Sequence, residues 1–282
     1  MTSCWANHDE ASSGVFESVH RGLTVQQIAT PRDRLMTCKS GDAASLVLAQ
    51  NTDCYDFIPV IDAAAPEERI IGLFNAGRFA EAPRPEGSVA SHMLPLAEDN
   101  LIGADASILD FIIYAHSRPC RLLVAGARIS GLVSLSDLQK LPVRAALFAL
   151  ITGFEIIMAE AIRRRYPAPE DWMAFLNDGR KGKIREQIAN AKKEDSFVDE
   201  LLFTQFSDKA DIIRKAFALS ASKSQLEGQL SEIRDLRDAL AHANEYASSP
   251  EQAKRVCQIV RNLLALKDEL TAKSTQQRHE VA

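Results

Sequence analysis

The chain has 282 residues, of which 46% are hydrophobic and 25% are charged. It can therefore bury a substantial core, and its length favours two domains. Lys and Arg number 33 against 38 Asp and Glu, giving a net charge of −5, which argues against a strongly basic nucleic-acid-binding surface. The five cysteines form no Cys-x-x-Cys pair. This pattern excludes a zinc knuckle or a disulfide scaffold and fits a reducing cytosol.

The N-terminus and the most apolar segment indicate the compartment. The opening sequence MTSCWANHDEASSG is polar, without a cationic start or an apolar run, so no signal peptide is visible. The apolar segment Arg144–Ile162 contains Glu155 and Glu160, and a membrane span should not hold two carboxylates. We therefore expect a buried helix in a soluble, cytoplasmic protein that has no membrane partner.

From Leu23 to Lys140, short runs of β-forming residues alternate with helical segments, and the pattern occurs twice. The predicted strands are Phe57–Asp62, Arg69–Phe74, Cys120–Gly126 and Arg128–Leu135, and the predicted helices are Ala43–Gln50, Gly77–Glu81, Ile108–His116 and Ser136–Leu141. We place the two repeats at about 20–82 and 88–142. The segment Glu81–Ser88, with two prolines and a glycine, connects them.

After Pro142 the pattern is helical only. The predicted helices are Ala145–Arg165, a short one starting at Pro169, then Lys183–Lys192, Asp208–Ala221, Ser224–Tyr246 and Pro250–Lys273. We therefore expect a multi-domain α+β protein: an α/β module at 19–143 followed by an all-α domain at 144–275. Flexible tails are expected at 1–18 and 276–282.

The end of the second repeat carries a recognisable motif. The segment Gly131-Leu132-Val133-Ser134-Leu135-Ser136-Asp137 consists of Gly, two apolar residues, Ser, two variable residues and Asp. With the strands around it, this pattern resembles the cystathionine-β-synthase (CBS) repeats that pair into a Bateman module. The resemblance covers about residues 20–142. It implies that Asp137 accepts hydrogen bonds from ribose hydroxyls and that Ser134 contacts the ribose or phosphate of an adenosine nucleotide.

The first repeat departs from this motif. Asn75 stands where the hydroxyl residue belongs, and Arg78 stands where the Asp belongs. Arg78 cannot accept a hydrogen bond from a ribose hydroxyl, but it could face the phosphate of a nucleotide bound by the other repeat. We therefore expect one site for an adenine nucleotide effector, such as AMP, ATP, S-adenosylmethionine or a cyclic dinucleotide. Two alternatives stay open: a module without a ligand, and a motif in which Ser134 and Asp137 only cap the following helix.

The predicted helix Ser224–Tyr246 carries the second group of candidate residues. Its apolar stripe includes Ile233 and Leu240, and we place Arg237 on that stripe between them, where a guanidinium needs a partner. Asp238 and His242 are four apart, so the carboxylate can orient the imidazole. Asn244 could add a hydrogen bond to a phosphate.

The spacing Arg237-x4-His242 resembles the signature of HEPN domains, all-helical modules of many RNases in toxin and antiviral systems. The family often has Asn after the Arg, where this chain has Asp238. The resemblance implies cleavage of single-stranded RNA without a metal ion or catalytic cofactor, with Arg237 on the phosphate and His242 moving protons. Residues five apart on a helix differ by about 140° in direction, so either the long Arg237 side chain reaches around the helix or two chains share the site. The resemblance implies a homodimer with a shared cleft.

Glu155 completes the predicted site. Thr152 and Glu155 are the polar residues of the run Ala145–Ala159, so Glu155 is expected to be buried and to form an ion pair with Arg237. The main reading is a nucleotide-regulated, metal-independent endoribonuclease in stress or phage defence. The alternative is a non-catalytic nucleotide-binding regulatory or dimerisation protein. A third reading makes the helical domain a target of nucleotidyl transfer.

Overall fold

The computed structural model describes residues 20–62, 64, 68–80, 82–193 and 199–280, with side chains through residue 273. The expected tail at 1–18 lies outside this range. The backbone divides into two compact units, one of residues 20–143 and one that contains residues 144–280, and each is described by itself. The helix α4 (Leu141–Arg165) spans the division between them.

The first unit contains two four-stranded sheets with orders β2-β3-β4-β5 and β1-β8-β7-β6. The strands are β1 (Thr30–Pro31), β2 (Cys38–Lys39), β3 (Phe57–Ile61), β4 (Ile70–Asn75), β5 (Leu94–Pro95), β6 (Leu101–Gly103), β7 (Cys120–Ala125) and β8 (Arg128–Ser134). The helices are α2 (Ala44–Gln50) and α3 (Ile108–Tyr114), with short 3-10 helices η1 (Val25–Gln27), η2 (Arg32–Arg34), η3 (Ala76–Phe79), η4 (Val89–Ser91), η5 (Glu98–Asn100) and η6 (Leu135–Gln139). The predicted α/β repeat is confirmed: each copy has a helix before and a 3-10 helix after an antiparallel hairpin.

The two copies exchange their edge segments. Strand β1 lies near the start of the first sequence repeat but pairs with β8 of the second, and β5 lies near the start of the second repeat but pairs with β4 of the first. Backbone hydrogen bonds near these strands also join one repeat to the other. The N–H of Val25 donates to Ala106 O at 2.8 Å, and the N–H of Val89 donates to Asp42 O at 2.9 Å. Consequently each structural copy contains a segment from outside its own sequence repeat.

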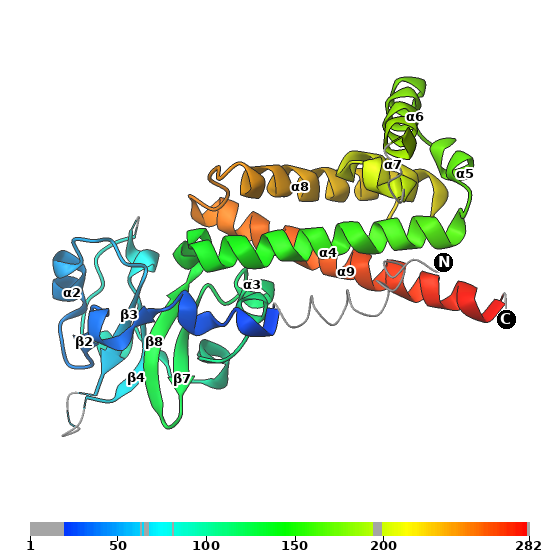
Figure 1. The fold of residues 1–282 in the computed structure, drawn as a ribbon. Helices are drawn as coiled ribbons and strands as arrows, with labels where there is room; N and C mark the ends of the chain where they lie inside the picture. Colours follow the sequence, from blue (N-terminus) through cyan, green and yellow to red (C-terminus); the bar gives the residue numbers. More distant parts are fainter. Residues whose placement is uncertain (1–19, 63, 65–67, 81, 194–198, 281–282) are drawn as a thin grey trace. The chain divides into compact units, whose positions relative to one another are not determined.

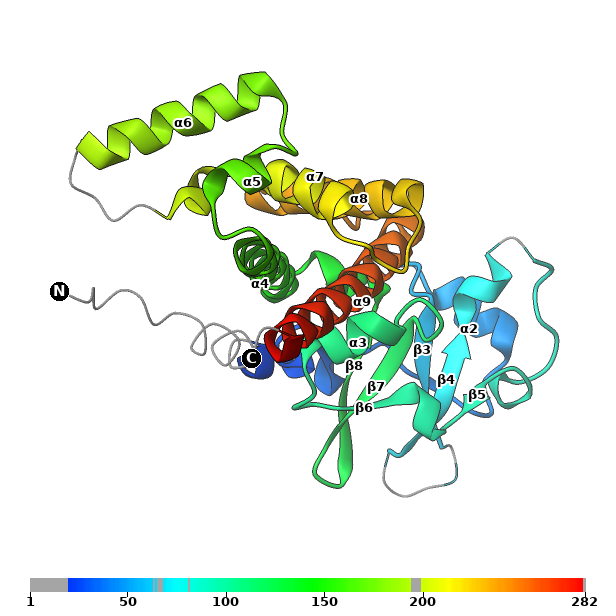
Figure 2. The same cartoon turned by 90° about the vertical axis from the view of Figure 1, so that its right-hand side faces the viewer.

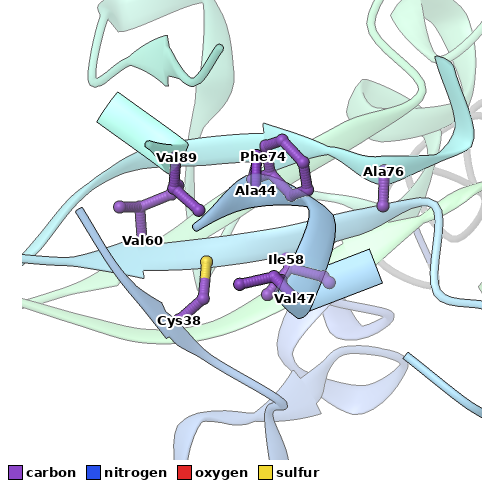
Figure 3. Close-up of a cluster of buried hydrophobic side chains, with 8 residues drawn as sticks. All are labelled: Cys38, Ala44, Val47, Ile58, Val60, Phe74, Ala76 and Val89. Carbon is purple, nitrogen blue, oxygen red and sulfur yellow. The ribbon is translucent and has the colours of Figure 1, made fainter. Parts of the chain in front are cut away.

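The core of the first copy shows this exchange in its side chains. Figure 3 shows Val89, from η4, lying beside Val60 and Cys38 among residues of β2, β3, β4 and α2. Val89 is fully buried there, and Val25 of η1 is also fully buried. A second cluster joins the two copies and consists of Ile70, Leu73, Cys120, Leu122 and Leu132, with Phe57 packed against it. The copies therefore bury their facing hydrophobic surfaces against each other.

The second unit is all helical in the residues that the structure describes. Its helices are α4, α5 (Pro169–Met173), α6 (Asp178–Lys193), η7 (Glu200–Phe203), α7 (Phe206–Ala216), α8 (Lys223–Ala241) and α9 (Pro250–Glu280). Helices α8 and α9 pack on each other, and α7 packs on α8 (Figure 1). Helix α9 continues to Glu280, so most of the segment expected as a C-terminal tail is helical.

Helix α4 is apolar on more than one side. By length and composition it could cross a membrane, with a mean hydropathy of 1.9 in its most apolar window, of which 44% is buried. Leu150, Phe154 and Met158 form its buried side. Figure 2 looks nearly along α4, and α5, α7, α8 and α9 lie above it and to its right. Helix α4 therefore has one buried apolar side and another on which Phe148 and Ile156 are exposed.

Candidate functional site

Asp137 lies in η6, directly after strand β8, and is 5% exposed. Its Oδ2 atom accepts a hydrogen bond from the backbone N–H of Ser134 at 2.6 Å, and its Oδ1 atom lies 2.7 Å from Lys140 Nζ. The Ser134 hydroxyl lies 2.8 Å from the hydroxyl of Ser136. The Ser and Asp of the motif thus do cap the short helix. Each carboxylate oxygen has two lone pairs, so Asp137 retains capacity to accept from a ligand if Lys140 moves aside.

Gly131 has a packing role in this structure. A side chain there would place its Cβ atom 2.6 Å from the carbonyl oxygen of Thr30, in the exchanged strand β1. Gly72 has the same position in the first copy, where a Cβ atom would lie 2.3 Å from the carbonyl oxygen of Leu94. The glycine of the motif therefore lets an edge strand approach closely, whether or not a nucleotide binds beside it.

In the first copy, Asn75 and Arg78 replace the Ser and Asp of the motif and form a different cap at the start of η3. The side-chain oxygen of Asn75 accepts from the backbone N–H of Arg78 at 3.2 Å, whereas in the second copy the Asp side chain accepts from the Ser backbone. The Arg78 side chain is exposed, and its guanidinium carbon lies 5.7 Å from the ring centre of Phe79. Arg78 is therefore accessible to an anion, such as a phosphate group.

Asp56 is an acidic residue that the sequence analysis did not single out. Its carbonyl accepts from the N–H of Gly77 at 3.1 Å, which fixes it next to the turn that carries Arg78. Burial raises the pKa of the Cys120 thiol, and the negative charges of Asp137 and Asp56 raise it further. Both carboxylates therefore act on one thiol, at the junction of the two copies. Only the tertiary structure brings these residues from two repeats together.

Arg237 occupies a different position from the one that the stripe predicted. The buried residues of α8 are Leu226, Leu230, Ile233, Leu236 and Leu240, so Leu236 rather than Arg237 fills the core position. The Arg237 side chain is 41% exposed, and its Nη1 atom lies 3.2 Å from Asp238 Oδ1. The expectation of a guanidinium in the core was wrong, because the stripe can continue from Ile233 in steps of three as well as four.

His242 lies beyond the end of the helix that was expected to contain it. Helix α8 ends at Ala241, His242 is its exposed C-cap, and Ala243 has a φ of 55°. The backbone N–H of Asn244 then donates to Ala239 O at 2.9 Å. The predicted helix to Tyr246 was therefore too long, and the chain turns in the left-handed conformation that commonly ends helices.

Arg144 holds this turn in place. Its Nη1 atom donates to the carbonyl oxygens of Ala239 and Leu240 at 3.1 and 3.0 Å, and its Nη2 atom donates to Asn244 O at 2.7 Å. Its guanidinium carbon also lies 5.0 Å from the ring centre of Tyr246, whose pKa burial raises to about 12. A cation at a helix C-terminus satisfies carbonyls that have no partner in the helix.

Glu155 is paired with a residue other than the one predicted. Its Oε1 atom lies 3.0 Å from Nζ of Lys209, on α7. The predicted pair of Glu155 with Arg237 was wrong, since Arg237 uses its neighbour Asp238. In the described part of the chain, no group of three or more His, Cys, Asp or Glu side chains is placed to hold a metal ion.

Comparisons with solved structures match less than half of this chain, but nearly the whole of the chains that they match. No family model and no curated protein matches the chain. Among solved structures, the CBS domain of a bacterial CNNM/CorC family Mg²⁺ transporter in complex with ATP is 19% identical, with a TM-score of 0.36, over 46% of this chain and 93% of its own. CBS domains of a transcriptional regulator from Streptococcus pneumoniae are 18% identical (TM-score 0.33) over 41% of this chain and 95% of theirs. CBSX2 in complex with AMP is 18% identical (TM-score 0.33) over 44% and 96%.

These neighbours are CBS domains, and each covers about half of this chain. The first unit of this chain is mixed α/β, and the second is helical in the residues that the structure describes. The HEPN-like character of the helical unit finds no support in these comparisons and stays a prediction. The catalytic roles proposed for Arg237, Asp238, His242 and Asn244 stay predictions as well.

Proposed function

We propose that the chain is a non-catalytic regulatory protein whose first unit binds one adenine nucleotide per chain at Asp137. The observation that carries the proposal is the buried carboxylate of Asp137 at the end of β8, held by the Ser134 N–H and covered by Lys140. A carboxylate with two acceptor oxygens suits the vicinal hydroxyls of a ribose.

The residues around Asp137 fit a nucleotide in two further respects. The Lys140 side chain is 42% exposed, so it can leave Asp137 and let a ribose hydroxyl donate in its place. Arg78, on the first copy, is exposed and cationic, as contact with a phosphate requires. Asp56 and Asp137 put two negative charges at the junction of the copies, which favours hydroxyl donors over phosphates at that point. The preference for adenine follows from the CBS resemblance.

A thermal-shift panel tests this proposal. AMP, ATP, S-adenosylmethionine and a cyclic dinucleotide are each added to the full chain, to Asp137→Asn and to Asp110→Asn. Asp110 is the matched control, because its carboxylate accepts from the N–H of Ser107 at 3.0 Å in a cap of the same kind at the start of α3.

A ligand that binds only the folded state stabilises it by about 2.7 kcal/mol at a hundredfold excess over Kd. We expect one of the four nucleotides to raise the melting temperature of the wild type and of Asp110→Asn, but not of Asp137→Asn. The absence of a shift with all four, or an equal shift in Asp137→Asn, would reject nucleotide binding at this position.

The second candidate function is metal-independent RNA cleavage at Arg237 and His242. One observation favours it: near the end of α8 the Arg237 side chain is 41% exposed and His242 is exposed, and Arg144 fixes the turn that follows. The ion pair of Arg237 with Asp238 opposes it, because it places a carboxylate where an RNA phosphate would bind. We therefore favour the regulatory function.

A further inference from the structure

The outward face of α4 is apolar and uncovered. Phe148 and Ile156 are 42% and 43% exposed, and Ala145 and Thr152, at helical spacing with them, are exposed as well. These four residues are called the α4 face below. Three or four residues separate successive members, so they form one stripe along the helix. Large apolar groups on one stripe of a helix are typical of a surface that contacts another protein or a membrane.

The α4 face carries no charged residue. Glu155 bonds to Lys209 of α7, and Arg144, just before this face in sequence, bonds to the turn after α8. The other charged residues of α4 are Glu160 and the run Arg163–Arg165 near its end. An acidic or basic partner surface would therefore leave its own charges unpaired on this face. The partner surface is therefore expected to be apolar as well.

We infer that the partner is a second copy of this chain, whose α4 packs antiparallel on the first about a two-fold axis at Thr152. The face is self-complementary around that residue, since Phe148 and Ile156 lie four residues to either side of it. In the dimer Phe148 of one copy meets Ile156 of the partner, and the two copies of Thr152 meet at the axis. A two-fold interface requires such a patch, which fits itself.

Charge decides between the two orientations. The run Arg163–Arg165 ends α4. Arg163 and Arg164 pair with Asp199 and Glu160, but a parallel pair would still bring the two cationic runs together, which is unfavourable. An antiparallel pair places the runs at opposite ends of the interface. It also lets the two helix dipoles run in opposite directions.

The α4 face lies mainly in the first half of its helix. A helix of 25 residues is about 37 Å long and about 10 Å wide with its side chains. The α4 face itself spans 12 residues, about 18 Å, so the contact is smaller than the roughly 1,000 Å² of a stable, specific interface. We therefore expect a dimer that dissociates at low concentration rather than an obligate one.

Light scattering after size exclusion, over a range of micromolar concentrations, tests the dimer. The wild type should reach twice the chain mass of 31.0 kDa. Phe148→Glu and Ile156→Glu should stay at the mass of one chain, because each buries a carboxylate in the apolar interface. Gln187→Glu adds the same charge at an exposed position of α6 and should leave the dimer unchanged. A wild type of single-chain mass, or Glu variants that still dimerise, would overturn the proposal.

Cross-linking tests the axis without relying on variants that change the charge. In a chain whose Cys4 and Cys54 are replaced by serine, Thr152→Cys should form an intermolecular disulfide under mild oxidation, because its own copy faces it. Lys183→Cys, on the exposed side of α6, should not. Chains with Phe148→Cys should cross-link to chains with Ile156→Cys when mixed.

If Thr152→Cys forms no intermolecular disulfide, the two copies do not meet at Thr152, and the proposal is overturned. Vesicles of phosphatidylcholine with phosphatidylglycerol provide the last arm. Sedimentation of the wild type with them, lost in Phe148→Glu, would assign the α4 face to a membrane instead of a second copy.

Discussion

The Nζ atom of Lys209 lies 3.0 Å from Oε1 of Glu155, which joins α7 to α4 inside the helical unit. The Lys209 side chain is only 7% exposed and also donates to the carbonyl oxygen of Thr204 at 2.9 Å. A buried cation of this kind requires its partners, because removal of one member leaves the other charged and poorly solvated.

The first prediction concerns this pair. Lys209→Met should destabilise the helical unit by on the order of 3 kcal/mol, since Glu155 is then left partly buried without a cation. Glu155→Gln in the same chain should recover a large part of that loss. Urea unfolding of the two single variants and the double variant measures the coupling. Additive effects of the two changes would contradict an energetic pairing of these residues.

Gly131 supports a second prediction, about the exchanged strand β1. A Cβ atom at this position would lie 2.6 Å from the carbonyl oxygen of Thr30, and this backbone atom cannot move without shifting β1. Gly131→Ala should therefore destabilise the first unit by about 1–3 kcal/mol. Gly41→Ala, in the same unit and with no atom within 4 Å of its Cβ position, should have an effect within about 0.5 kcal/mol. Equal stability of the two variants would show that β1 does not pack as described.

The third prediction concerns the reactivity of the cysteine thiols, which reports on each of the two units individually. Cys54 is exposed, whereas Cys38, Cys120 and Cys257 are buried. Burial raises the pKa of Cys257 to about 11, and burial together with the charge of Asp42 raises the pKa of Cys38 to about 12. At pH 8, iodoacetamide followed by peptide mapping should label Cys54 rapidly and the three buried thiols only on unfolding. A bound nucleotide should slow the labelling of Cys120 and leave that of Cys257 unchanged.

The same thiols predict how stability changes with pH. An unfolded thiol has a pKa near 9.0, so a folded pKa of about 11 favours the protonated, folded form of Cys257. Its contribution to stability is fully present below pH 9 and is lost as the pH rises toward 11. The free energy of unfolding of the helical unit, measured in urea, should therefore fall between pH 9 and pH 11. Cys257→Ala should reduce this fall, and an unchanged pH dependence in that variant would assign it to other groups.

The sequence predicted the hairpins, the helices before them and the change to all-helical structure well, because these features depend on local periodicity. It did not predict the exchange of edge strands, since Thr30–Pro31 and Leu94–Pro95 are two-residue strands whose partners lie far along the chain. It also misplaced Arg237, because helical periodicity after Ile233 permits either Leu236 or Arg237 to be buried. The helix end at Ala241 depends on Arg144, whose contacts with that turn only the tertiary structure supplies.

A further prediction concerns RNA cleavage. A labelled unstructured RNA incubated in EDTA with the full chain, with and without each nucleotide of the thermal-shift panel, should stay intact. Cleavage that is lost in both Arg237→Ala and His242→Ala would contradict the non-catalytic function and support the HEPN-like site instead. Lys183→Ala, at an exposed position of α6, is a control for nuclease contamination of the preparation.

Calorimetric titration of AMP and ATP into the full chain tests the central claim most directly. A hydrogen bond to a charged group contributes about 1.5–3 kcal/mol, so loss of the Asp137 charge should weaken binding at least about tenfold. We predict one site per chain in the wild type and in Asp110→Asn, and a Kd at least about tenfold higher in Asp137→Asn. Binding of equal affinity in wild type and Asp137→Asn, or no heat of binding with either nucleotide, would contradict the claim that Asp137 binds an adenine nucleotide.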